Sequence, residues 1–111
     1  MDNRRFPELH DIIETGRRIE KFIHRTPVMK SMLLNEMFQS ELYFKCENFQ
    51  KVGAFKFRGA VNAVLSLGKE ELEKGVVTHS SGNFAAALSL AARMNGAEAF
   101  IVMPGCKRPI L

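Results

Sequence analysis

A strand–helix–strand pattern in the second half of the chain restricts the fold more than any other feature. Short apolar runs at 75–79 and 99–103 predict strands, and the segment 83–95 between them has the length and apolar content of a helix closed by Gly96. Strands joined at this spacing form a parallel βαβ unit with a right-handed crossover. Alanine and leucine cover most of the helix circumference, so burial on more than one side is expected. The predicted fold class is α/β.

Helical spacing dominates the first half of the chain. Apolar residues recur at helical intervals over 7–23 and over 57–65, and Gly68 is placed to terminate the second of these helices. Ser31 is placed to cap a short helix between them. Alternating apolar residues at 42–46 predict a strand.

Composition argues against several classes of protein. The chain has 111 residues, of which 46% are hydrophobic and 25% charged, as is ordinary for one small globular domain. Its net charge of +4 arises from interspersed charges typical of solvated helix faces, which disfavours a nucleic-acid partner. Cys46 and Cys106 form no disulfide framework or metal motif, and no apolar run has the length of a membrane span. The expected protein is cytoplasmic, without a metal site or membrane contact.

Lys56 lies between Phe55 and Phe57 in a glycine-punctuated turn at 51–59. A lysine amine is nucleophilic only when neutral, and apolar neighbours favour the neutral form by withholding water from the ammonium. Lys56 is therefore a candidate nucleophile of the Schiff-base type. The alternative is an ordinary solvated lysine on an amphipathic helix, and this segment taken alone favours that alternative.

The loop Ser80-Ser81-Gly82-Asn83 follows the first predicted strand of the βαβ unit and opens its helix. Unpaired backbone N–H groups and the helix dipole make such a position an anion site, and ligands of open α/β sheets bind at this edge. Glycine lets the backbone approach a ligand closely, and the hydroxyls and amide add directed hydrogen bonds. The alternative is a plain helix cap built from turn residues, which is more frequent for this sequence in isolation.

Taken in order, these motifs resemble the serine racemase and threonine dehydratase branch of the pyridoxal-phosphate enzymes, whose fold is typified by the tryptophan synthase β subunit. The resemblance runs from about residue 9 to residue 103. Its matched segments are 24–28, 44–47, 55–63, 77–83 and 101–104. It implies a partial fold of pyridoxal-phosphate type II, with parallel βαβ units in a three-layer α/β arrangement.

The resemblance implies a role for each matched residue. Lys56 would attach pyridoxal 5'-phosphate (PLP) covalently and then move the proton at the substrate Cα. Phe55 would pack beside the cofactor, and Asn83 would hydrogen-bond its phenolic oxygen. The substrate carboxylate would be bound by the loop of Ser80, Ser81, Gly82 and Asn83. The cofactor itself supplies the electron sink.

Ser81 favours a racemase within this branch. Racemisation needs a second acid or base on the cofactor face opposite the lysine, and the family's racemases carry a serine here, whereas its dehydratases commonly carry alanine. The implied enzyme racemises serine and eliminates water from serine or threonine, giving a keto acid and ammonia. Ser31 and Lys51 match positions where some racemases contact a nucleotide effector. The family also implies a divalent cation, bound outside this chain, and a homodimer of the full-length form.

The chain departs from the family in two respects. Phe84 stands where the family has histidine, and no Gly-Gly pair is present to serve as the glycine run that holds the cofactor phosphate. The resemblance divides the chain into 1–67, part of the large cofactor-binding domain, 68–104, an incomplete small domain, and a divergent tail at 105–111. A truncated form is therefore expected, poorly stable and inactive alone, with unpartnered apolar faces at 9–23 and 57–65. The alternative to an enzyme is an inactive isoform or fragment that at most associates with full-length subunits.

Overall fold

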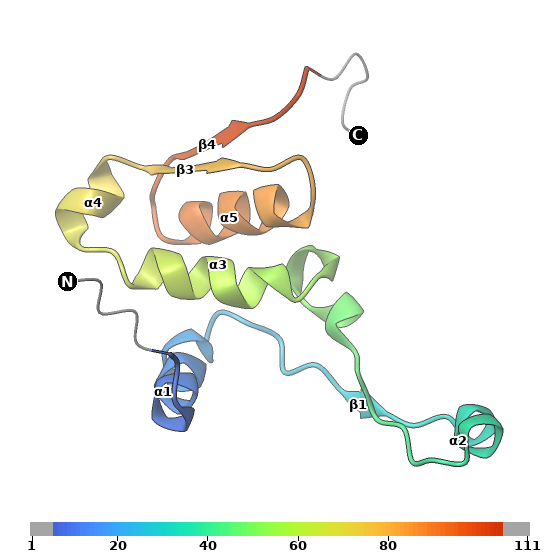
Figure 1. Ribbon diagram of the computed structural model, residues 1–111. Coiled ribbons are helices and arrows are strands. Elements are labelled where there is room, and N and C mark those ends of the chain that lie inside the picture. Colours follow the sequence, from blue (N-terminus) through green and yellow to red (C-terminus); the bar gives the residue numbers. More distant parts are fainter. Residues whose placement is uncertain (1–5, 106–111) are drawn as a thin grey trace.

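The computed structural model describes residues 6–105 and shows a layered α/β body from which one segment projects (Figure 1). In chain order, with η marking short 3-10 helices, the elements are α1 (Leu9–Ile19), β1 (Val28–Met29), α2 (Met32–Phe38), β2 (Phe44–Lys45), η1 (Glu47–Phe49), η2 (Lys51–Gly53), α3 (Lys56–Leu65), α4 (Lys69–Glu73), β3 (Val76–His79), α5 (Asn83–Met94) and β4 (Ala99–Val102).

The predicted βαβ unit is confirmed. Strands β3 and β4 pair in parallel, with Val76 opposite Ala99 and His79 opposite Val102, and α5 connects them. Helix α5 contacts both strands on one side and α3 on the other, so it lies as the middle layer between the sheet and α3 (Figure 1). This position explains the alanine-rich sequence of α5, because small side chains let neighbouring elements approach from more than one side.

The core is formed where α3 packs on α5. Phe57, Val61 and Val64 of α3 are essentially inaccessible to water. They pack in one cluster with Ile19 of α1 and with Ala60, Ala87, Leu88 and Ala91. The prediction that the apolar face of 57–65 lacks a partner is therefore wrong, because α5 covers it. On α1, by contrast, Leu9 and Ile12 are 72% and 63% exposed, as expected.

Two helix boundaries differ from the prediction. The first helix ends at Ile19 and not near residue 23, because the Phe22 N–H bonds the Ile19 carbonyl at 2.9 Å and turns the chain. Helix α3 ends at Leu65, and Gly68 does not terminate it. Gly68 instead precedes α4, and its N–H donates to the Glu71 carboxylate at 2.8 Å.

The projecting segment, residues 28–45, is called the arm below. The predicted strand at 42–46 is reduced to β2, which pairs antiparallel with β1, a strand that the sequence pattern did not predict. Ser31 caps α2 as predicted, because its hydroxyl accepts the Leu34 N–H at 3.4 Å. The Asn35 side-chain oxygen accepts the Leu42 N–H at 2.9 Å and so joins α2 to the segment that leads back to β2.

Three further expectations concern a membrane span, the division into domains and the C-terminal tail. Among residues 6–105, no helix has the length and apolar character needed to cross a membrane. The proposed division at residue 67 stays a prediction, and the tail at 105–111 lies almost wholly outside the described residues.

Gly16 and Gly75 should respond in opposite ways to an added methyl group. Apart from the backbone of α1 itself, no atom of residues 6–105 lies within 4 Å of the position that a Gly16 Cβ would take, so Gly16→Ala should stabilise the chain by about 0.5–1 kcal/mol through its higher helix propensity. Gly75 has a φ of +79°, and its Cβ would lie 2.9 Å from the Glu98 carbonyl oxygen, so Gly75→Ala should destabilise. Urea unfolding followed by circular dichroism measures both, and a destabilising Gly16→Ala would contradict the expectation.

Candidate active site

The two motifs singled out in the sequence lie at the same end of one helix pair. Helices α3 and α5 pack together and run in the same direction, so both begin at one end of the body (Figure 1). Lys56 is the first residue of α3, and Asn83 is the first residue of α5. Helix η2, which precedes Lys56, also contacts α5. The fold therefore brings the lysine turn and the Ser80–Asn83 loop together.

Lys56 is exposed, and its amine Nζ lies 5.1 Å from the centroid of the Phe55 ring. Phe55 is itself 59% exposed, whereas Phe57 is fully buried in the core. Only one of the two flanking aromatic rings thus lies beside the amine. The apolar enclosure expected around Lys56 is not supplied by residues 6–105.

The turn before Lys56 has an unusual backbone. Val52 has a φ of 57° and Gly53 a φ of 68°, and a β-branched residue in the left-handed region costs on the order of 1 kcal/mol. The turn is held by the Gly53 N–H, which bonds the Gln50 carbonyl at 2.8 Å. The Gln50 side chain is buried, and it pairs with the backbone of His24 by accepting the N–H at 2.9 Å and donating to the carbonyl at 2.8 Å.

An ion pair joins η1, which precedes this turn, to α3. Arg58 binds both carboxylate oxygens of Glu47, through Nε at 2.8 Å and Nη2 at 2.7 Å, in the bidentate geometry that makes such pairs strong. The buried Thr26 hydroxyl donates to the same carboxylate at 2.5 Å. Glu47, Arg58, Thr26 and Gln50 are called the clamp below. The sequence analysis did not identify the clamp.

The clamp changes the acidity of Glu47. Hydrogen bonds from Arg58, assisted by the one from Thr26, lower the pKa of Glu47 from 4.5 to about 2 against the opposing effect of burial. The same pair raises the pKa of Arg58. Both side chains are mostly shielded from water, with 19% of Glu47 and 29% of Arg58 exposed, so this pair is worth more than a surface salt bridge.

The Ser80–Asn83 loop presents polar groups to solvent. The Ser80 hydroxyl accepts the Gly82 N–H at 3.3 Å, while the side chains of Ser81 and Asn83 are exposed. Within residues 6–105, no acceptor bonds the N–H groups of Ser81, Asn83 or Phe84. Unpaired N–H groups at the start of the 12-residue helix α5 favour a negatively charged ligand.

Phe84 turns away from this loop. Its half-buried side chain packs against the core and lines an apolar cavity of about 310 Å³ together with residues of α3 and β3, among them Val64 and Val76. The aromatic ring therefore serves packing between α5 and its neighbours.

The residues matched to a nucleotide effector lie on different elements. Ser31 caps α2 on the arm, whereas Lys51 belongs to η2, and its Nζ lies 5.6 Å from the centroid of the Phe57 ring. Across the part of the chain that the structure describes, no group of three metal-ligating side chains occurs.

Comparison with known proteins identifies the family. Residues 19–110 match the model of the pyridoxal-phosphate dependent enzyme family, so the chain belongs to this family. It is 56% identical to serine racemase of Dictyostelium discoideum over 86% of this chain and 30% of that protein. It is 60% identical to serine racemase of Arabidopsis thaliana over 87% of this chain and 29% of that protein.

The solved structure of maize serine racemase aligns with a TM-score of 0.84 and 52% identity, over 87% of this chain and 30% of that one. The predicted partial fold of type II is thereby confirmed. The chain spans about 30% of the length of the relatives that it matches.

The clamp should contribute to stability in a pH-dependent way. Because the pKa of Glu47 is lowered from 4.5 to about 2, the stabilisation is complete above pH 4.5 and is lost as pH falls toward 2. Glu47→Gln should cost about 2–3 kcal/mol at neutral pH and much less at about pH 3. Urea unfolding at both pH values tests this. Glu41→Gln, in the exposed pair with Lys30, is the matched control and should leave the unfolding midpoint unchanged. Equal midpoints for wild type and Glu47→Gln at neutral pH would contradict the expectation.

Replacing Phe84 by histidine, the residue that the family resemblance implies there, should destabilise this chain. Phe84 lines a mainly apolar cavity and packs against the core, where an imidazole would have its polar nitrogens poorly paired, so Phe84→His should cost about 1–3 kcal/mol. Phe84→Leu keeps the site apolar and should cost less, under about 1.5 kcal/mol. Urea unfolding ranks the two variants. A Phe84→His chain at least as stable as Phe84→Leu would show that the ring does not serve packing.

Proposed function

We propose that the chain carries the lysine-bearing part of a PLP-dependent amino-acid racemase and dehydratase, acting on serine and, by elimination of water, on serine and threonine. The observation that carries this proposal is the placement of Lys56 and the Ser80–Asn83 loop at one end of the α3–α5 pair. The similarity to serine racemases supports it.

The residues at this end fit the cofactor in part. An exposed amine, an exposed aromatic ring and an exposed amide are available on Lys56, Phe55 and Asn83. Lys56 would hold the cofactor through its amine, Phe55 would pack beside the cofactor ring, and Asn83 would bond its phenolic oxygen. When bound, the cofactor supplies an electron sink for the charge that develops at the substrate Cα. The sequence has no glycine run to hold a phosphate group.

The remaining residues would bind the substrate and move its proton. The free N–H groups at the start of α5, with the Ser80 to Asn83 loop, would bind the substrate carboxylate. Lys56 would take the Cα proton on one face of the substrate, and the exposed Ser81 hydroxyl would serve as acid on the other. Two groups on opposite faces are what racemisation requires, whereas elimination needs only the lysine.

Finer features of the family remain predictions for this chain. These are a nucleotide effector at Ser31 and Lys51, a divalent cation bound elsewhere, a homodimer and a cytoplasmic location. Ser31 already uses its hydroxyl to cap α2, which leaves its proton to donate to an effector.

A second candidate function is a noncatalytic product that associates with longer subunits of the family. The exposed apolar side chains of α1 favour it, since large apolar surfaces mark interaction sites. Co-purification with a longer subunit, in the absence of Lys56 reactivity, would distinguish this function from the first.

Incubation of the chain with PLP and reduction with borohydride tests the leading proposal. Peptide mapping should find the pyridoxyl group preferentially on Lys56, because its amine lies beside the Phe55 ring and it begins α3 at the end where α5 also begins. Lys56→Arg should remove that label and Lys51→Arg should leave it. The 111-residue chain alone should not turn over serine, because its sequence has no glycine run for the phosphate.

Uniform labelling of Lys56 and exposed lysines such as Lys69 would overturn the assignment of Lys56. Selective labelling together with serine turnover would overturn the expectation that the 111-residue chain is inactive alone.

A further inference from the structure

The connection between α5 and β4 begins with Asn95 followed by Gly96, and no other asparagine in the sequence precedes a glycine. A glycine has no Cβ, so its backbone nitrogen is open to approach the side chain of the residue before it. An asparagine carboxamide is a group that such a nitrogen can attack. Gly96, which follows the cap of α5 with a φ of 70°, therefore also makes Asn95 a reactive residue.

The reaction open to this pair needs only water as a co-reactant. The Gly96 nitrogen loses its proton and bonds to the Asn95 Cγ, the bond from Cγ to Nδ2 breaks, and ammonia leaves behind a cyclic imide. Water then adds to one of the two imide carbonyls and opens the ring. Addition at Cγ gives aspartate, and addition at the backbone carbonyl gives isoaspartate, whose main chain runs through Cβ and Cγ. No electrons are exchanged with an oxidant or a reductant.

The folded structure holds both reacting groups apart. Asn95 Nδ2 donates to the Ala91 carbonyl at 2.8 Å, which directs the carboxamide back over the last turn of α5. The Gly96 N–H bonds the Arg93 carbonyl at 3.3 Å. Because the ψ of Asn95 is 13°, the Gly96 nitrogen nearly eclipses the Asn95 nitrogen and lies turned away from the side chain. Attack on Cγ therefore requires both hydrogen bonds to break and ψ to rotate.

These restraints belong to one helix end, where opening is local. Arg93 and Gly96 are exposed and Asn95 is only half-buried, and helix ends open at a lower free energy than the core does. Other asparagines combine less reactive neighbours with firmer positions. Asn62 lies inside α3 before an alanine, and Asn83 precedes Phe84, whose side chain packs against the core. Asn95 is thus the residue at which the reactive sequence and a local opening coincide.

We propose that Asn95 is a site of spontaneous deamidation, and that opening of the last turn of α5 controls its rate. Either product then weakens the structure that protected Asn95. Aspartate loses the Nδ2 donor to Ala91, and its charge is unfavourable at the negative end of the helix dipole. Isoaspartate lengthens the main chain shortly before Glu98, whose carbonyl accepts the Val76 N–H at 2.8 Å where β3 meets β4. Deamidation therefore makes opening of the α5–β4 connection irreversible.

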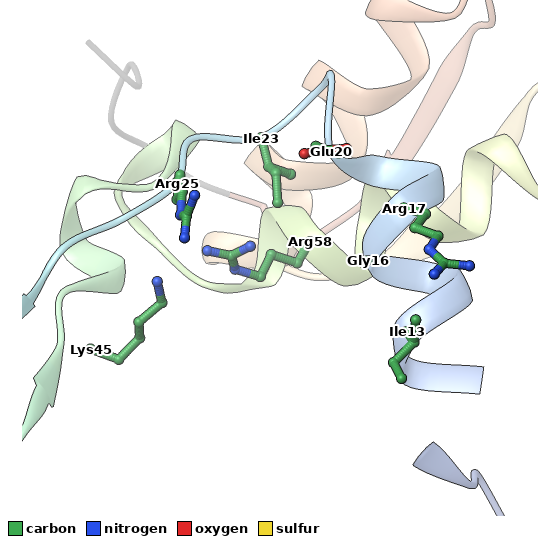
Figure 2. Close-up of a pocket in the computed structure, with 8 residues that line it drawn as sticks. All are labelled: Ile13, Gly16, Arg17, Glu20, Ile23, Arg25, Lys45 and Arg58. Carbon is green, nitrogen blue, oxygen red and sulfur yellow. The ribbon is translucent and has the colours of Figure 1, made fainter. Parts of the chain in front are cut away.

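The modified site is separate from the groups proposed for catalysis. Asn95 lies at the opposite end of α5 from Asn83 and the Ser80–Asn83 loop. The pocket of about 450 Å³ between α1 and α3, shown in Figure 2, has no lining residue from the α5–β4 connection. PLP labelling of Lys56 should therefore be the same in deamidated and unmodified chains that remain folded, so the two proposals fail independently.

Timed incubation of the full 111-residue chain at slightly alkaline pH and physiological temperature tests the proposal. A lysine-specific protease releases the peptide 75–107, which holds Asn83 as an internal reference beside Asn95. Liquid chromatography with tandem mass spectrometry separates and locates the asparagine, aspartate and isoaspartate forms. In guanidinium chloride above the unfolding midpoint, Asn95 should deamidate about tenfold or more faster than in the folded chain, and much faster than Asn83 in both states.

Two glycine substitutions at exposed positions of α5 distinguish local from global opening. Arg93→Gly weakens the last turn and should speed deamidation of Asn95 about threefold in the folded chain, without changing the rate in guanidinium chloride. Ala86→Gly is the matched control, because it lowers helix propensity near the start of α5 and should leave the rate close to that of wild type. Circular dichroism verifies that both variants fold.

Equal rates at Asn95 in the folded and unfolded wild-type chain would overturn control by α5, as would equal effects of Arg93→Gly and Ala86→Gly. Modification of Asn83 in preference to Asn95 would overturn the assignment of the site. The deamidated fraction should also unfold at a lower guanidinium concentration than the unmodified fraction. Coincident unfolding of the two fractions would refute the proposed weakening of the α5–β4 connection.

Discussion

The packing of α3 on α5 is the contact on which the rest of the structure depends. Alanines at positions 60, 87 and 91 have no exposed surface, so the two helices approach closely around Phe57 and Val61. Because the helices also run in one direction, their N-termini lie at a common end (Figure 1). The same apolar contact therefore stabilises the body and places Lys56 near the start of α5. A substitution that separates the helices would displace both halves of the candidate site.

Polar contacts hold the backbone that precedes α3, which the packing of α3 on α5 does not fix. Backbone sterics oppose the positive φ of Val52, so the turn before Lys56 keeps its shape only because its surroundings hold it. Gln50 joins that turn to the backbone of His24, and the Glu47–Arg58 pair joins the preceding helix η1 to α3. None of these side chains is proposed to touch substrate. Their common effect is to orient the first turn of α3.

Sequence reasoning predicted the elements that depend on residues close together in the chain. It failed for features that depend on how side chains from different elements are oriented in the folded protein. The βαβ unit follows from apolar runs, and the Ser31 cap follows from one residue and the helix after it. Helical spacing over 57–65 placed Phe57 on the apolar face of a helix, and the structure buries it there, so the expectation that both aromatic neighbours enclose Lys56 was inconsistent with that spacing. Gly68 was misassigned because glycine both ends helices and precedes them. The Glu47–Arg58 pair gave no signal, since its residues lie on different elements.

The exposure of Lys56 bears directly on the chemistry proposed for it. A lysine is an effective nucleophile when its surroundings exclude water and favour the neutral amine, and residues 6–105 leave Lys56 exposed. The Schiff-base role proposed for Lys56 therefore requires an enclosure that residues 6–105 do not supply. Lys56 and Arg58 lie on the first turn of α3, so the ion pair that holds Arg58 also limits where the Lys56 amine can lie.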